Sequence, residues 1–316
     1  MDINERAEVK EIKFKDHEEW LSIRKKYIGG SDAGAVIGMN EYKSRYTLWA
    51  EKTGKIPGFD GNLTTKVGAY LEQLVADLFE EETGKKVRKK NATLVNDLYP
   101  FACANLDRVV VGEKAFLEIK TTNSIPLMKS IRNSEEFPEA YYAQVTHYLA
   151  VTGYEKAYLA VLINCRELKI YELERNQAEI DALMGAEKEF WKLVENDTPP
   201  AADGDDSTSE TLTTLYPNSN GETIQLFGFD NDLRQYIDLQ AQIKSLTALK
   251  DEIGNKVKEY MKEAGKAESD KFKVSWASSE RKTFDSKRFE SDHPNIDLGG
   301  YYNTSSSRRF TVTERK

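Results

Sequence analysis

The sequence predicts an α/β fold in which a mixed sheet is flanked by helices, followed by a smaller C-terminal extension made of one long helix and short strands. Three observations lead to this prediction. Helical and strand-like segments alternate over roughly the first two hundred residues, a pattern typical of a sheet covered by helices. A stretch rich in Pro, Asp, Ser and Thr follows. After it come a long helical pattern and several short polar runs.

The stretch rich in small polar residues predicts a linker between two domains. A chain of 316 residues exceeds the usual size of one domain. Residues 199–222 show no apolar period, as expected of a connecting segment. We therefore expect one domain at residues 1–198 and a second at residues 223–316.

The first domain is expected to run helix, strands, helix, strands, helix. Its first predicted helix, residues 66–82, carries an apolar stripe formed by Val67, Leu71, Leu74, Val75 and Leu78. Turn-forming residues bound the later segments. We expect strands at residues 86–95, 101–104, 107–111 and 115–121, a helix at 139–151, a hairpin of 156–164 with 167–173, and a last helix at 178–194.

The second domain should begin with a helix at residues 230–263, because its apolar residues recur near a 3.5-residue period. Such a helix could pack on the first domain or on another chain. Short strands are expected at residues 271–276, 281–284 and 308–313, where basic and aromatic residues interleave. That composition fits either a DNA contact or a small solvated sheet.

Composition excludes several classes of protein. No run of about 18 apolar residues occurs, and the charged N-terminus does not resemble a signal peptide; we therefore expect a soluble cytoplasmic protein without a membrane span. Two cysteines, both expected to be buried and reduced, are too few for a disulfide framework. Three scattered histidines argue against a histidine zinc site or a serine–histidine hydrolase. Any metal here should be held by carboxylates.

The formal charge of −8 argues against nonspecific coating of nucleic acid, because phosphate neutralisation needs clustered Lys and Arg. Two local basic clusters, residues 24–26 and 85–90, nevertheless stand out. Each fits a solvated face as well as a basic groove.

A hairpin at residues 107–120 is the most informative segment. Gly112-Glu113 fits a tight turn with glycine first, so Val111 should oppose Lys114. Counting outward, Asp107 falls opposite Glu118. Because side chains alternate along a strand, Glu118 and Lys120 should share a face with Asp107, and Leu117 and Ile119 should point to the other face.

Two acids facing each other across a hairpin repel, at a cost of a few tenths to about 1 kcal/mol. A divalent cation with oxygen ligands would compensate them. The same geometry fits an exposed hairpin face with ordinary charges, on which Lys120 is a partial counter-ion. A third acid, Glu72, favours a metal site, because it lies at the edge of the apolar stripe of helix 66–82, with Gly68 one turn before it.

The pattern resembles the D…(D/E)XK signature of the PD-(D/E)XK nucleases. Asp107 and Glu118-Ile119-Lys120 match that signature, and residues 67–72 resemble the preceding helical G-x-x-x-E element of the lambda exonuclease and YqaJ-like viral recombinase branch. The wider order of motifs makes the match more specific. It runs through residues 20–24, 28–32, Glu72, Asp107, residues 118–120 and residues 143–148. The resemblance covers roughly residues 15–195.

This resemblance implies a chemistry. Glu72, Asp107 and Glu118, with the backbone carbonyl of Ile119, would hold one or two Mg²⁺ ions, for which Mn²⁺ can substitute. Lys120 would orient the attacking water or neutralise charge on the scissile phosphate. The implied activity is 5′→3′ digestion of linear double-stranded DNA, which releases 5′-mononucleotides.

The resemblance also implies a pocket for the 5′-phosphate, formed by Arg24, Ser31 and Gln144. Arg24 can grip phosphate in a bidentate manner. Ser31 can cap a helix whose amides attract an anion, although a plain helix cap explains it equally. Asn105 stands where relatives often carry a small hydroxyl residue, so the sequence departs from the family pattern at that part of the pocket. Gln144 alone would be read as a surface residue.

Partners and competing functions follow from the same comparison. The family implies DNA ends as substrate, a homotrimeric ring, a single-strand annealing protein as partner, and a phage or prophage origin in a bacterial cell. The alternatives are an endonuclease or a helicase-associated nuclease module, although no Walker A pattern occurs. A noncatalytic DNA-end-binding protein is the alternative of another class.

Overall fold

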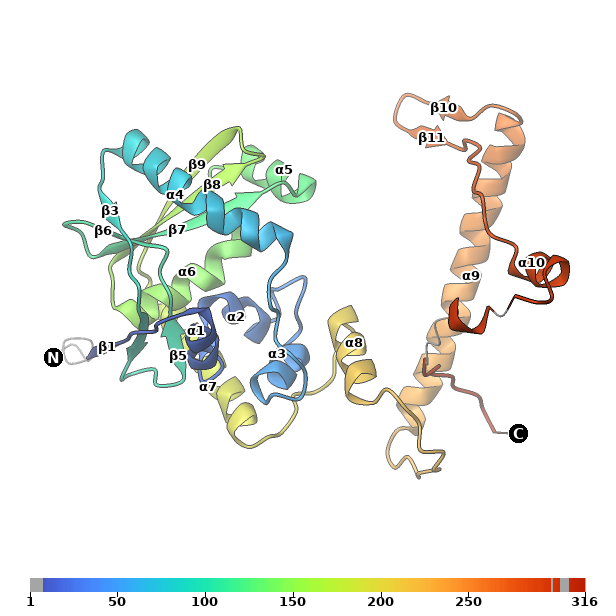
Figure 1. The fold of residues 1–316 in the computed structure, drawn as a ribbon, viewed down its shortest axis with the longest axis horizontal. Coiled ribbons are helices and arrows are strands. Elements are labelled where there is room, and N and C mark those ends of the chain that lie inside the picture. Colours follow the sequence, from blue (N-terminus) through green and yellow to red (C-terminus); the bar gives the residue numbers. More distant parts are fainter. Residues whose placement is uncertain (1–7, 297, 302–306, 316) are drawn as a thin grey trace. The chain divides into compact units, whose positions relative to one another are not determined.

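The computed structural model describes residues 8–296, 298–301 and 307–315. The chain divides after Leu215 into two compact units. The first carries the mixed sheets with their covering helices, and the second carries one long helix with a small hairpin (Figure 1). Within the described ranges, no helix is both long enough and apolar enough to span a membrane. The predicted fold class is confirmed.

The first unit contains two sheets and eight helices among its described residues. Its strands are β1 (Val9–Ile12), β2 (Ile28–Gly29), β3 (Val87–Arg88), β4 (Thr93–Asn96), β5 (Ala102–Ala104), β6 (Arg108–Val110), β7 (Ala115–Thr122), β8 (Lys156–Ile163) and β9 (Glu167–Glu174). Its helices are α1 (His17–Arg24), α2 (Gly30–Val36), α3 (Arg45–Lys52), α4 (Leu63–Thr83), α5 (Ile125–Asn133), α6 (Glu139–Thr152), α7 (Gln177–Glu195) and α8 (Asp206–Leu215).

The larger sheet has the strand order β3-β6-β7-β8-β9. Strands β7 and β8 are parallel, because the chain crosses between them through α5 and α6, and the other pairs are antiparallel. The smaller sheet has the order β1-β4-β5-β2, with β2 and β5 parallel. Both sheets therefore contain parallel and antiparallel pairs, as the alternation of helices and strands in the sequence predicted.

Helices α4 and α6 cover opposite faces of the larger sheet (Figure 1). Leu117 and Ile119 of β7 pack in one core cluster with Val75 and Phe79 of α4. Phe116, the neighbour of Leu117, packs instead in the cluster of α6, and its ring lies 5.8 Å from that of Tyr148. Because side chains alternate along β7, Glu118 and Lys120 point toward the α6 side.

The predicted helix at residues 66–82 is longer than expected and turned slightly about its axis. Asn62 caps its first turn by accepting a hydrogen bond from the Thr65 amide at 3.1 Å. Val67 and Leu74, assigned to the buried stripe, are exposed, whereas Val75, Ala76 and Phe79 are buried. The apolar residues outnumber the positions that face the sheet, so the sequence pattern alone did not choose between two adjacent stripes.

The strand predicted at residues 86–95 is two strands in different sheets. β3 pairs with β6 in the larger sheet, and β4 pairs with β1 and β5 in the smaller one. Lys89, Lys90 and Asn91 make the crossing between them and lie at the surface or half-buried. The alternation of polar and apolar residues along a strand does not indicate which sheet the strand joins, because that depends on tertiary packing.

The hairpin of β8 and β9 is confirmed, with its turn at Asn164 and Cys165, both at positive φ. The turn exposes Cys165, whereas Cys103 is buried in β5. The prediction that both cysteines are buried was therefore wrong for Cys165. Turn residues must face solvent here because the strands on either side fill the sheet.

Helix α8 lies inside the segment expected to be a linker. It packs through small polar side chains on the start of α3: the Ser44 amide donates to Ser207 Oγ at 2.8 Å, and Thr208 Oγ1 donates to Ser44 Oγ at 2.7 Å. Thr208 and Thr211 are buried. Its apolar contacts with the core come from Leu212 and Leu215 alone, too short a pattern for a search for apolar periodicity to detect.

The second unit contains α9 (Asp230–Met261), the hairpin β10 (Lys266–Glu268) with β11 (Lys273–Ser275), and the short helix α10 (Ser286–Asp292). The long helix and one of the three predicted strands are confirmed. Residues 281–284 and 308–313, predicted as strands, have no regular structure. Among the described residues of this unit, neither segment has a neighbouring strand with which to pair, and an isolated strand is not stable in water.

Candidate active site

The hairpin of β6 and β7 has the register that the turn residues predict. Arg108 pairs with Leu117 and Val109 with Phe116, so continuing the register sets Asp107 opposite Glu118. Gly112 takes the positive φ of 84° that a tight turn requires and that glycine adopts without strain. The Ile119 amide donates a 2.7 Å hydrogen bond to Asp107 Oδ2. This bond fixes the Asp107 carboxylate against the second strand.

Glu118 is the most enclosed of the predicted acids, with 2% of its surface exposed. Its Oε1 accepts hydrogen bonds from Lys120 Nζ and Gln144 Nε2, each at 2.6 Å. Its other carboxylate oxygen, Oε2, is buried without a hydrogen-bond partner in the structure. A buried charged oxygen without a partner is costly, so Glu118 has an acceptor available for a cation.

The pKa values of this cluster reflect crowded negative charge. Burial, and then the negative charge of Glu118, raise the pKa of Asp107 well above its usual range, although Lys120 and the Ile119 amide act in the opposite direction. Burial tends to lower the pKa of Lys120, but the Glu118 and Asp107 charges outweigh it and raise the pKa. Lys120 therefore stays charged, while two carboxylates share one lysine.

Glu72 approaches from the other face of the sheet. Arg108 pairs in register with Leu117, whose side chain packs toward α4, so Arg108 also points toward α4. Its buried guanidinium donates from Nη1 to Glu72 Oε1 and to the Asp107 carbonyl, and from Nη2 to Gln73 Oε1 at 3.2 Å. Arg108 thus joins Glu72 to the backbone of Asp107.

The three predicted acids do not form one cluster of ligands in the structure. Within residues 8–296, 298–301 and 307–315, no group of three or more acid, histidine or cysteine side chains could hold a metal ion. Glu72 is near enough to raise the pKa of Asp107 further, but its carboxylate is engaged by Arg108. Asp107 and Glu118 are the two acids that the hairpin brings together.

Arg24 and Ser31 meet at the start of α2. Arg24 Nη2 donates to Ser31 Oγ, and its guanidinium lies 5.1 Å from the Trp20 ring centroid. Ser31 is not the helix cap that the sequence suggested. Gly29 occupies that position. Its amide donates a 3.1 Å hydrogen bond to Asp32 Oδ2, so the capping carboxylate comes from the first turn of the helix.

Asp32 balances the positive charge of this corner. Its carboxylate is buried and lies 2.7 Å from Lys52 Nζ. Burial would raise the pKa of Asp32, but the charges of Lys52, Arg24 and Lys43 together lower it strongly. Lys43 is itself paired with Glu51. Arg24 and Lys52 therefore remain against the one carboxylate of Asp32, which leaves the corner positive.

Helix α6 connects this corner to the acids. Gln144 binds Glu118, and Tyr148, one turn later, lies against Gly30, where an added Cβ would meet the tyrosine ring at 2.4 Å. Burial and then the charge of Glu118 raise the pKa of Tyr148 well above its usual value, although the charge of Arg24 acts in the opposite direction. The structure therefore brings both predicted groups of residues to one face of α6.

Asn105 precedes Asp107 in the chain and is half-buried. Its Nδ2 donates to Thr93 Oγ1 at 2.9 Å. This bond ties the loop between β5 and β6 to β4. The contact gives Asn105 a place beside the hairpin and a structural role there.

Sequence reasoning missed Asp32, Lys52, Arg108 and Tyr141. The sequence offered a signal for Asp32, because this residue directly follows Ser31 in the motif at residues 28–32. Arg108 directly follows Asp107, and a lone arginine in an apolar strand is a usable signal. The sequence offered no signal for Lys52, because its partners Asp32, Tyr27 and Arg24 lie 20 to 28 residues earlier in the chain. Tyr141, whose ring lies 5.8 Å from Lys120 Nζ, also lacked a local signal.

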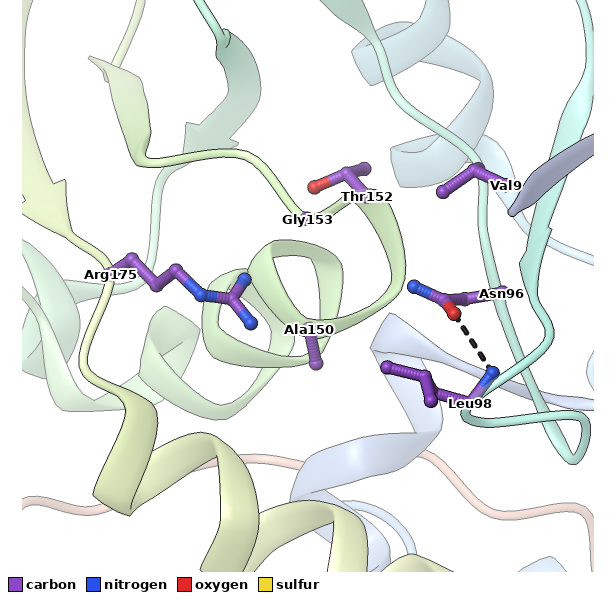
Figure 2. A pocket seen from close by; sticks show the side chains of 7 residues that line it. All are labelled: Val9, Asn96, Leu98, Ala150, Thr152, Gly153 and Arg175. Carbon is purple, nitrogen blue, oxygen red and sulfur yellow. Dashed lines mark hydrogen bonds between the residues drawn. The ribbon is translucent and has the colours of Figure 1, made fainter. Parts of the chain in front are cut away.

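A separate small cavity of about 180 Å³ lies at the C-terminal end of α6 (Figure 2). Its lining includes Asn96, Thr152 and Arg175. Their polar groups are bonded within the chain: Asn96 accepts from the Leu98 amide and donates to the Val151 carbonyl, and Arg175 donates to the Leu149 carbonyl. Arg175 therefore caps the end of α6, and the cavity is a structural gap.

The fold is that of alkaline exonucleases. LHK-Exo, an alkaline exonuclease from Laribacter hongkongensis, matches with a TM-score of 0.50 and 20% sequence identity over 57% of this chain and 94% of its own. Its complex with dAMP matches with a TM-score of 0.51, at the same identity and coverage. At this identity the likeness establishes the fold.

Sequence comparisons establish the family. Residues 19–155 match the model of the YqaJ-like viral recombinase domain. The uncharacterized protein YqaJ of Bacillus subtilis is 38% identical over 285 residues, which cover 88% of this chain and 89% of that protein. Protein D345L of African swine fever virus is 36% identical over 61 residues, 19% of this chain and 18% of its own. The chain belongs to the YqaJ-like viral recombinase family.

Proposed function

We propose that this protein is a divalent-metal-dependent exonuclease that digests linear double-stranded DNA from its ends in the 5′→3′ direction. It would release 5′-mononucleotides and leave 3′ single strands for phage-type recombination. The observation that carries the proposal is the buried Glu118 carboxylate, with one oxygen unpartnered, set opposite Asp107 and bound to Lys120. The exonuclease fold and the recombinase family support it.

The donor set fits a hard divalent cation. Asp107, Glu118 and the Ile119 carbonyl would hold Mg²⁺, with Mn²⁺ as a substitute, because oxygen ligands without thiolate or imidazole suit these ions. Glu72 is a further ligand in this proposal, and that role requires its release from Arg108. A bound divalent ion supplies Lewis-acid stabilisation and lowers the pKa of water.

The remaining residues of the cluster have separate tasks. Lys120, kept charged by its acid neighbours, would neutralise charge on the scissile phosphate. Gln144 would hold Glu118 Oε1, so that Oε2 faces the cation site. Tyr141 packs against Lys120 and restricts its position.

Arg24 and Ser31 would bind the 5′-phosphate of the strand being digested. Arg24 and Lys52 against the one buried carboxylate of Asp32 leave a positive charge that favours an anion at this corner, and α6 joins the corner to the acids. Gln144 and Asn105 belong to the edge of the same proposed pocket. Digestion from a phosphorylated 5′ end follows from this placement.

Assembly and partners extend the proposal. The resemblance to lambda exonuclease supports a homotrimeric ring and a single-strand annealing protein as partner. A cytoplasmic location in a bacterial host fits a recombination enzyme. Neither the ring nor the annealing partner bears on whether the isolated chain digests DNA.

The deciding experiment incubates purified protein with end-labelled linear duplex that carries either a 5′-phosphate or a 5′-hydroxyl, with Mg²⁺ or with EDTA. We expect mononucleotides only with Mg²⁺ or Mn²⁺, and faster release from phosphorylated ends. Full digestion in EDTA would exclude the metal. Nicking of covalently closed circles would favour the endonuclease, and end binding without products would favour the noncatalytic alternative.

A further inference from the structure

Helix α9 carries an apolar stripe that none of the described residues of its own unit covers. Among the 32 residues of the helix, Met261 is the one that is buried. The exposed apolar residues are Leu239, Ile243, Leu246, Leu249, Ile253, Val257 and Tyr260. An isolated helix gains most of its stability from packing an apolar face, so a helix of this length requires a partner.

The spacing of the stripe specifies what kind of partner it is. Leu239, Leu246, Ile253 and Tyr260 recur every seven residues, and Ile243 and Val257 lie four residues after Leu239 and Ile253. These are the d and a positions of a heptad repeat, with Lys250 as the one polar a position between them. A strict 3.5-residue period keeps a seam in contact with another helix, not with a sheet.

We propose that α9 pairs antiparallel with α9 of a second copy of this chain, as a two-stranded coiled coil. This inference is independent of the proposed nuclease activity. The seam runs from residue 239 to residue 260, about 30 Å at the usual helical rise. On α4, the longest helix of the first unit, the exposed apolar stripe spans only residues 63–74. A second α9 matches the seam over its whole length.

Charge determines the orientation. In an antiparallel pair centred on Ala248, Lys250 of one helix is level with the apolar Leu246 of the other. A parallel pair would instead set Lys250 beside Lys250 in the core. Like charges beside each other oppose that orientation.

The same register pairs the apolar layers. Ile243 of one helix lies opposite Ile253 of the other, and Leu239 lies opposite Val257. Lys250 is opposite Leu246, so its aliphatic stem can cover the leucine while the ammonium group reaches water. Two such lysine layers near the middle weaken the pair and fix its register.

The first test compares the mass of the full-length protein with that of two double variants by sedimentation. Leu246→Asp/Ile253→Asp places two charges in the seam. Ala241→Asp/Ala248→Asp places the same charges on the opposite, exposed face of α9. We expect the seam variant to have half the mass of the wild type and lower helicity, and the control to match the wild type.

The readout is the ratio of the wild-type mass to the mass of the seam variant, because this ratio separates pairing through α9 from a ring of nuclease units. If the first units form trimers, two rings joined through α9 would fall to one ring in the seam variant. If no ring forms, a dimer would fall to a monomer. Equal masses for the wild type and the seam variant would overturn the proposal and would assign the stripe to the first unit or to another protein.

The second test uses cysteines in a Cys165→Ser background, because Cys165 is exposed. The Ile243→Cys/Ile253→Cys double variant should form covalent dimers on oxidation, since the antiparallel register sets residue 243 opposite residue 253. Ile243→Cys alone should stay monomeric on a non-reducing gel. Efficient crosslinking of the single variant would overturn the antiparallel register in favour of a parallel pair.

Discussion

At the scale of the residue, the acids of the β6–β7 hairpin work against the stability of the chain. Asp107 and Glu118 lie opposite each other, and burial and this repulsion raise the pKa of Asp107. Lys120 and Gln144 both bind the same oxygen of Glu118, which leaves the other buried and unpartnered. A fold keeps such an arrangement when something other than stability requires it.

Replacement of Asp107 by Asn should separate folding from activity. Because the folded pKa of Asp107 lies above its unfolded value, this group stabilises the fold at low pH, and the contribution is lost as pH rises through the folded pKa. Near neutral pH, Asp107→Asn without metal should therefore keep its stability or gain up to about 1 kcal/mol. Digestion of DNA should cease. Melting curves from pH 4 to 8 with paired rates test this, and near-normal activity would refute the assignment.

Lys120→Ala should behave differently from Asp107→Asn. It leaves both acids available to a cation, so stabilisation by Mg²⁺ and DNA binding should persist, while the rate falls by about 10²–10³. Lys114→Ala is the matched control, since Lys114 lies on the same hairpin and is exposed. Loss of Mg²⁺-induced stabilisation in Lys120→Ala would mean that the lysine maintains the site and has no part in the chemistry.

The residues that could be predicted share one property, which is that short-range geometry fixes their neighbours. Gly112 sets the turn, the turn sets the register, and alternation then brings Asp107, Glu118 and Lys120 together. The bond between Arg108 and Glu72 crosses from strand to helix over 36 residues. Periodic patterns in the sequence relate residues only within one helix or strand, so the hydrogen bond that engages Glu72 could not be predicted from them.

At the scale of the element, α6 is the piece that joins the two candidate sites. Its close contact with α2 depends on Gly30, whose Cβ position is occupied by the ring of Tyr148. Elements that meet so closely admit no intermediate side chain. The geometry of the Arg24–Ser31 corner relative to Glu118 therefore rests on one glycine.

Gly30→Ala should destabilise the protein by about 1–3 kcal/mol through overpacking, and it should weaken digestion from phosphorylated ends. The control is Gly34→Ala in the same helix, where the nearest atom, Asn40 Cβ, lies at an ordinary 3.7 Å. That variant should be as stable as the wild type or slightly more so, because alanine favours a helix. Chemical denaturation of both variants measures the difference. Equal stabilities would mean that Tyr148 moves freely.

A buried pair ties α6 to α7. His147 Nε2 donates to the Cys103 carbonyl, so Nδ1 faces Glu187 at 2.8 Å. Burial tends to lower the pKa of His147, but Glu187 and the Cys103 carbonyl raise it, as does the charge of Asp32. Burial raises the pKa of Glu187, against the charge of His147. One proton bridges the two side chains in either protonation state.

The pH dependence of Glu187→Gln follows from these directions. In the wild type the raised pKa of His147 stabilises the fold below its unfolded value near 6.5, and this contribution is lost as pH rises through the folded pKa. Without the Glu187 charge, burial dominates, so the variant should lose about 3 kcal/mol at pH 5.5 and less at pH 9. Glu189→Gln, on the exposed face of α7, should change little. A pH-independent loss would contradict a proton-linked pair.

Elements were predictable where an apolar period matched a buried face. β7, β8, α6 and α7 were expected within about two residues of their observed ends. The break between β3 and β4 depends on which sheet each strand joins, and α8 packs through serine and threonine. Neither effect leaves an apolar period, so neither could be derived from the sequence.

At the scale of the whole molecule, the uneven charge distribution matters more than its sum. The formal charge is −8, yet Arg24 and Lys52 together face the one carboxylate of Asp32, since Lys43 is paired with Glu51. An acidic surface limits nonspecific binding along DNA, and a local positive corner favours a phosphate at one place. Such a distribution suits an enzyme that starts at ends.

The recognition of a 5′ end can be tested as a ratio of two rates. For the wild type, kcat/KM should be higher on 5′-phosphorylated than on 5′-hydroxyl duplex. Arg24→Gln should lower that preference by about 10- to 100-fold at most, the value of a charge-assisted hydrogen bond, and bring it toward one. Lys25→Gln, at the exposed neighbouring position, should retain it.

Arg24→Lys should fall between these two variants, because lysine keeps the charge but cannot bind phosphate through two nitrogens. The ratio is informative where a single rate is not: a general defect in folding or metal binding slows digestion of both substrates equally and cancels. Loss of the hydrogen bond from Arg24 to Ser31 would also slow both substrates equally and leave the ratio unchanged, unless this pair contacts the terminal phosphate. An unchanged ratio in Arg24→Gln would therefore place phosphate recognition elsewhere on the protein, even if the variant were slow.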